Sequence, residues 1–120
     1  MIEPPSRFEL DVLHATLDDQ RQKYPALYGQ IPFLSVRSRE LTGVGAYINF
    51  DLPDDPRVPI EPGRPDTVLT ANKTIEMDDP PSGMSFAIDI AGGRINFLEL
   101  VTFGDETWDG TVGHYEITPV

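Results

Sequence analysis

Residues 85–103 read SFAIDIAGGRINFLELVTF. Two runs in which apolar residues recur at alternate positions flank the pair Gly92-Gly93. Two glycines accept the positive φ angles that a tight two-residue hairpin turn requires. The stretch therefore predicts an antiparallel hairpin made of two half-buried strands, 85–91 and 94–103.

The register of this hairpin raises a question about Glu99. Regular pairing outward from the turn puts Glu99 on the same face as the apolar residues Ile95 and Phe97. A buried carboxylate is unfavourable unless it is paired or protonated. Two alternatives follow. Either a bulge near Leu98 turns Glu99 outward and puts Leu98 and Leu100 on the core side, or Glu99 points inward and forms part of a site.

The chain before the β pattern predicts one amphipathic helix. Ser6 and Glu9 have the spacing of a capping box, and Pro25 disfavours helical backbone at the residue before it. Apolar residues between these points recur at helical intervals, at Leu10, Leu13, Leu17 and Tyr24. We expect a helix over about 7–23, followed by one further turn at 25–29.

Further strands are expected at 31–38, 44–50, 67–75 and 111–118. Prolines stand at every third position from Pro53 to Pro65, which is typical of a stiff strap between two strands. The predicted fold class is α+β, with one N-terminal amphipathic helix packed on a mostly antiparallel sheet of about six strands. Residues 1–120 are expected to form a single domain.

The composition excludes several classes of function. The 120 residues carry a net charge of −11 and include no cysteine, which excludes disulfides and thiolate metal sites. The nine basic residues are scattered, so nucleic-acid binding is not expected. No apolar run is long enough to span a membrane, and the N-terminus is unlike a signal peptide. We expect a cytoplasmic protein whose acidity suits a basic protein partner.

No catalytic residue, metal site or cofactor is predicted. The two histidines, His14 and His114, lie in separate elements and lack a nucleophile motif or a metal-ligand spacing. The acidic groups at 51–55 and 105–109 lack the twelve-residue pattern of a calcium loop.

A few residues are candidates for binding. Gly43 and Gly45 leave one face of the strand 44–50 open to close approach. Arg39 could form an ion pair with Glu40 at the end of the sheet. Trp108, in an acidic loop, is either a contact anchor or a lid on the core. The remaining candidates are Tyr47 and the carboxylate Glu99.

Part of the chain resembles a family of small, uncharacterised bacterial proteins. The resemblance rests on the Thr-Gly-Val-Gly run at 42–45 and on Leu98-Glu99 with the downstream Thr102 and Trp108. It extends over most of the chain after residue 31. It implies a bacterial α+β protein and carries no activity, but it marks Gly43, Gly45, Glu99 and Trp108 for attention.

Three functions remain open. The favoured one is a non-enzymatic protein-interaction module, such as an acidic inhibitor, an immunity-like protein or a complex subunit. The second is a structural homodimer subunit, since an open sheet has edges that can pair. The third is a small-ligand or weak enzymatic site between helix and sheet, around Glu99 with Tyr47 or an arginine.

Overall fold

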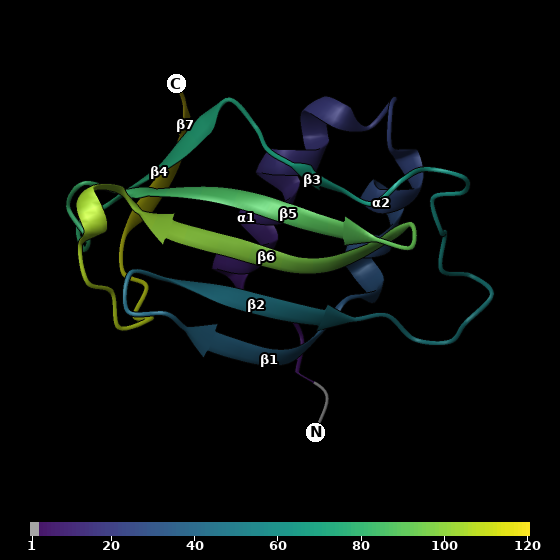
Figure 1. The fold of residues 1–120 in the computed structure, drawn as a ribbon, viewed down its shortest axis with the longest axis horizontal. Helices are drawn as coiled ribbons and strands as arrows, with labels where there is room; N and C mark the ends of the chain where they lie inside the picture. The colour runs from purple at the N-terminus through teal and green to yellow at the C-terminus, as the bar shows by residue number, and fades with distance from the viewer. Residues whose placement is uncertain (1–2) are drawn as a thin grey trace.

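The structure is a computed structural model that describes residues 3–120. The helices lie together on one side of a single sheet (Figure 1). In chain order the elements are α1 (Arg7–Leu17), α2 (Pro25–Gln30), β1 (Ser35–Leu41), β2 (Gly45–Asp51), β3 (Thr67–Leu69), β4 (Lys73–Met77), β5 (Met84–Ala91), β6 (Arg94–Thr102) and β7 (Tyr115–Pro119). Short 3₁₀ turns occupy Asp18–Gln20, Ile31–Phe33 and Phe103–Asp105.

The sheet has the strand order β1-β2-β6-β5-β4-β7, with β3 also paired to β5, and every pairing is antiparallel. The predicted α+β class is confirmed, with seven strands where about six were expected. In Figure 1 the strands β1, β2, β6 and β5 lie in front of the helices, and none of the described helices covers their near face. We call this uncovered side the outer face.

The predicted capping box is present at the start of α1. The Ser6 backbone N–H donates to Glu9 Oε1 at 2.8 Å, and the Glu9 N–H donates to Ser6 Oγ at 3.1 Å. The helix ends at Leu17, six residues before the predicted end. Gln20 Nε2 donates to the Thr16 carbonyl at 2.9 Å, a group that the Gln20 N–H would bind if the helix continued.

Other boundaries also differ from the prediction. Residues 31–33 form a 3₁₀ turn instead of strand, because α2 continues directly into Ile31 and Pro32, and β1 begins only at Ser35. The run 67–75 is split into β3 and β4 by a break at 70–72. The strap at 53–65 contains no helix or strand and connects β2 to β3.

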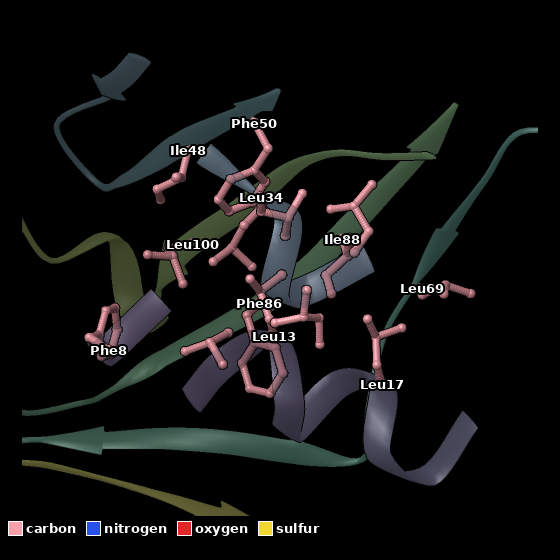
Figure 2. Close-up of a cluster of buried hydrophobic side chains, with 14 of the residues drawn as sticks. Phe8, Leu13, Leu17, Leu34, Ile48, Phe50, Leu69, Phe86, Ile88 and Leu100 are labelled. Atoms are coloured by element: carbon pink, nitrogen blue, oxygen red, sulfur yellow. The ribbon is translucent and has the colours of Figure 1, made fainter. Parts of the chain in front are cut away.

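The hydrophobic core lies between the helices and the inner face of the sheet. Leu13 and Leu17 of α1 project toward Phe86 and Ile88 of β5, and all four side chains are buried (Figure 2). Alternate residues of β2 supply the adjoining part of this core: Ala46, Ile48 and Phe50. Burial of these apolar side chains is the main contribution to the stability of the fold.

The hairpin contains one bulge. Pairing is regular from the turn to Ile90 and Ile95, after which Asp89 pairs with Phe97, so Asn96 is an extra residue in β6. The bulge is held by a hydrogen bond from Asn96 Nδ2 to Asp89 Oδ2 at 3.0 Å.

The bulge settles the orientation of Glu99. Leu98 and Leu100 face the core, and Glu99 lies between them on the outer face, partly exposed. Of the two alternatives, the outward one is therefore correct, although the extra residue is Asn96 and not a residue next to Leu98. The alternative with Glu99 pointing into the core is wrong, because side chains alternate along β6 after the bulge.

Gly45 is needed where β2 meets β6. A Cβ atom at this position would stand 1.8 Å from the Leu100 carbonyl oxygen, so the close approach expected at this glycine is made by strand backbone. We expect Gly45→Ala to lower the free energy of unfolding by about 3 kcal/mol, since the two strands must separate. Urea unfolding measures this change. Gly113→Ala is the control, because its Cβ would meet nothing within 4 Å, and an equal loss in both variants would contradict the prediction.

Candidate functional site

The residues singled out in the sequence separate onto two sides of the sheet. Tyr47 and Glu99 lie on the outer face, whereas Arg39 and Trp108 line a cavity on the helix side. Gly43 lies in the turn between β1 and β2, where its φ of +92° suits glycine and its carbonyl accepts the Trp108 N–H at 3.0 Å. Tyr47 thus lies near Glu99, and Arg39 and Trp108 border the same cavity, but the sheet separates the first pair from the second.

On the outer face, neighbouring strands align an acidic row. Glu40 of β1 is opposite Tyr47 of β2, which is in turn opposite Glu99 of β6. The next row contains Phe97, whose ring meets the Tyr47 ring edge-on, with the ring centroids 5.5 Å apart. Asn49 Nδ2 donates to Glu40 Oε2 at 3.0 Å.

The carboxylates keep the Tyr47 phenol neutral. A hydrogen bond to Glu99 and the negative charge of that carboxylate raise the pKa of Tyr47 above its ordinary value of 10.0, and Glu40 adds to the effect. Tyr47 is therefore a hydrogen-bond donor throughout the physiological pH range. We name the group formed by Glu40, Tyr47, Phe97 and Glu99 the acidic aromatic patch.

On the helix side, Arg39 binds the carboxylate of α1's capping residue. Arg39 Nε donates to Glu9 Oε2 at 2.8 Å and Nη2 donates to Glu9 Oε1 at 2.9 Å, while Nη1 lies 3.0 Å from Glu3 Oε1. The predicted Arg39–Glu40 pair is wrong. Consecutive strand residues point to opposite faces, so Glu40 lies on the outer face and Arg39 beneath it.

The Glu9 carboxylate is charged despite being buried. Burial raises the pKa of Glu9, but hydrogen bonds from Arg39 and Ser6, together with the charge of Arg39, outweigh this and place the pKa below its ordinary value. The Glu9 hydrogen bonds in turn raise the pKa of Arg39. The pair is therefore ionised at neutral pH.

Next to this ion pair lies a cavity of about 580 Å³. It is bounded by the start of α1, by the ends of β1 and β2, by β6, and by the segment 108–115. Trp108 forms one wall; it is 7% exposed, and its indole N–H donates to the Thr111 carbonyl at 2.9 Å. Trp108 thus covers part of the core and also borders the cavity.

Two residues of this region were not singled out as binding residues from the sequence. Tyr115 of β7 packs edge-on against Phe8 with centroids 4.9 Å apart, and its hydroxyl donates to Asp11. Glu9 was identified only as a helix cap. The one signal in the sequence was that Glu9 stands between the apolar residues Phe8 and Leu10, where a carboxylate is close to the buried side of the helix. Its partner lies on a strand 30 residues later.

The site predicted between helix and sheet around Glu99 is wrong in its location. Glu99 and Tyr47 meet on the outer face, so of the binding residues predicted from the sequence, Arg39 and Trp108 are those that border the helix–sheet cavity. Within residues 3–120, no group of three or more His, Asp or Glu side chains is arranged to hold a metal ion. No helix in the described part of the chain is long and apolar enough to cross a membrane.

Comparison of the chain with protein-family models, curated proteins and solved structures finds no match in any of the three. The resemblance to a bacterial family therefore stays a prediction. The function has to be argued from the geometry of the two faces.

Proposed function

We propose that this chain is a non-enzymatic protein-interaction module that binds a basic protein partner through the outer face of its sheet. The observation that carries the proposal is the acidic aromatic patch, in which Tyr47 lies between the carboxylates of Glu40 and Glu99 and packs against Phe97, on a face that no described helix covers. A cytoplasmic location belongs to the same proposal and is checked by cell fractionation.

The aromatic pair supplies the apolar part of such an interface. Tyr47 and Phe97 are both partly exposed and hold each other edge-on, so their rings are ordered before a partner arrives. Aromatic side chains contribute much of the binding energy at protein interfaces, and ordering in advance reduces the entropy lost on association. The Tyr47 hydroxyl already donates its one hydrogen to Glu99, so its oxygen is left as an acceptor for an N–H group of the partner.

The carboxylates determine the charge of the surface that the partner presents. Glu40 and Glu99 flank Tyr47, and the chain as a whole carries a net charge of −11. A basic surface is attracted by this field and associates faster. A second copy of the chain would set like charges face to face, which disfavours the alternative of a homodimer built on this face. Light scattering that finds a dimer at micromolar concentration would favour that alternative.

The test compares two double variants that remove the same charge. The chain and each variant are used to capture partners at low salt from a lysate of the host. The captured protein is then purified and titrated. Glu40→Gln with Glu99→Gln should weaken its affinity at least tenfold. Glu76→Gln with Glu116→Gln, an exposed cross-strand pair on β4 and β7, should change the affinity less than twofold.

The aromatic contribution is tested separately with Tyr47→Ala, which should also weaken binding at least tenfold. Equal affinity losses in the two double variants would mean that the partner responds only to net charge. Unchanged affinity in both the Glu40/Glu99 variant and Tyr47→Ala would place the interface elsewhere. Either result would overturn the proposal.

A further inference from the structure

We infer that the cavity beside Arg39 and Trp108 is a binding site for an uncharged, mainly hydrocarbon small molecule that carries one oxygen acceptor. This site is separate from the acidic aromatic patch, which lies on the other side of the sheet. The inference rests on the size, the apolar floor and the charge balance of the cavity.

The size and the floor suit a small hydrocarbon ligand. A volume of about 580 Å³ lies within the range of small-ligand sites. The floor is formed by side chains that are almost fully buried and come from α1, β2, β6 and the loop after β6: Phe8, Ala46, Ile48, Leu100 and Trp108. Apolar ligand surface placed on this floor would be removed from water, which favours binding.

Exposed apolar side chains stand at the rim of the cavity. Leu41 is 56% exposed and Val112 is 36% exposed, and both line the cavity. Leu41 also touches the main-chain position of Gly110, since a Cβ there would lie 3.0 Å from Leu41 Cδ2. A bound molecule would cover these two side chains, and their burial adds to the apolar contribution of the floor.

The charged groups of the cavity cancel one another. Arg7 and Arg39 are balanced by Glu3 and Glu9, and Arg39 already contacts both carboxylates. An anionic ligand would have to compete with Glu9 and Glu3 for the guanidinium, and a cationic one would meet Arg39 itself. An uncharged ligand avoids the unfavourable desolvation that a charged ligand of either sign would undergo in this cavity.

Arg39 also supplies the polar contact. A guanidinium has five N–H groups, and two of those of Arg39 donate to Glu9. A third N–H group, on Nη1, faces Glu3, and the remaining N–H groups are left for one further acceptor. The Arg39 side chain is 35% exposed, so a ligand can reach them. A hydroxyl or carbonyl oxygen at the end of the hydrocarbon therefore completes the set. This contact orients the ligand, and the floor supplies most of the affinity.

Trp108 provides the readout, because it is the only tryptophan of the chain and forms a wall of the cavity. Octan-1-ol, octanoate and octylammonium share one hydrocarbon chain and differ in charge. Titration of the protein with octan-1-ol should shift the Trp108 emission in a saturable way. Octanoate and octylammonium should each bind at least tenfold more weakly.

Three variants locate the binding. Ala46→Leu adds carbon atoms to the floor and should abolish the saturable shift, with urea unfolding used to show that the variant is folded. Val112→Asp puts a charge at the rim and should weaken octan-1-ol binding at least fivefold. Val68→Asp makes the same change at a 57% exposed position of β3, outside the cavity, and should bind within twofold of the parent chain.

Several results would overturn the inference. These are the absence of a saturable shift with octan-1-ol, binding of either charged probe as tight as that of the alcohol, and unchanged binding in Ala46→Leu or Val112→Asp. A loss in Val68→Asp equal to that in Val112→Asp would show surface adsorption and overturn it as well. None of these results bears on the partner of the outer face.

Discussion

Arg39→Met should lower the free energy of unfolding at neutral pH by about 2 to 3 kcal/mol. The substitution leaves the Glu9 carboxylate, whose side chain is 6% exposed, without the two hydrogen bonds from the guanidinium. Losing one partner of a fully buried pair has a larger effect, but Arg39 is itself 35% exposed, so water reduces the loss. Urea unfolding followed through Trp108 emission measures it.

The loss should also depend on pH. In the parent chain the pKa of Glu9 is below its ordinary value of 4.5, so its stabilising contribution is present above that value and disappears as the pH falls through the folded-state pKa. In Arg39→Met, burial is opposed only by Ser6, and the folded-state pKa of Glu9 rises. At acid pH the Glu9 carboxylate of the variant becomes protonated, so the buried unpaired charge that destabilises the variant is removed. The difference in unfolding free energy between the two chains should therefore narrow from pH 7 to pH 4.

Arg37→Met is the matched control on the same strand. Arg37 forms an ion pair with Asp51 in which both side chains are more than half exposed, so its removal should change the unfolding free energy by less than about 0.5 kcal/mol. If Arg39→Met is no less stable than Arg37→Met, or if the difference from the parent chain is the same at both pH values, the Glu9–Arg39 pair does not have the role given to it.

The second large effect is expected at Gln30, at the end of α2. Its side chain is fully buried, and Nε2 donates to the carbonyls of Pro59 at 2.8 Å and Gly93 at 2.9 Å. Its Oε1 accepts the Ile95 N–H at 3.0 Å. One amide thus connects α2 to the strap, to the hairpin turn and to the start of β6.

Gln30→Leu should lower the unfolding free energy by about 3 kcal/mol. Leucine fills a similar volume but leaves the Pro59 carbonyl and the Ile95 N–H buried without this partner, and each unpaired group is unfavourable by about 1 to 3 kcal/mol. Thermal or urea unfolding measures the loss, and the Ile95 amide should exchange its hydrogen faster.

The same substitution at an exposed glutamine, Gln22→Leu, should change stability by less than about 0.5 kcal/mol. The prediction for Gln30 fails if the two variants are equally stable, or if Ile95 keeps its protection in Gln30→Leu.

The features that the sequence predicted correctly are those with local signals. The Gly92-Gly93 turn needs only two adjacent residues with positive φ, and both have it. The two residues of the capping box, Ser6 and Glu9, are three positions apart. The apolar residues of the run before the Gly92-Gly93 turn recur at intervals of two, and the buried positions of β5 follow the same alternation. In each case the physical cause and the sequence pattern lie within a few neighbouring positions.

The candidate site was predictable only in part, because its contacts join distant segments. Tyr47 and Glu99 were named together, and both lie on predicted strands. The sequence did not predict that these two strands are neighbours, and the residues meet on the face away from the helix. Arg39 was assigned to its sequence neighbour, but its partner Glu9 is 30 residues away. Gln30 carries no local pattern at all, since its three partners lie 29, 63 and 65 residues further along the chain.

The extra residue at Asn96 determines where β6 can lose a residue during evolution without disturbing the fold. If Asn96 were absent, Ile95 would be followed by Phe97 in an unbroken ladder, and every later side chain of β6 would keep its present face. A deletion of one residue within 98–100 would instead move core leucines and the outer-face carboxylate of Glu99 to the opposite faces of the sheet. Single-residue gaps between this chain and its descendants are therefore expected at position 96 and not in the strand that follows.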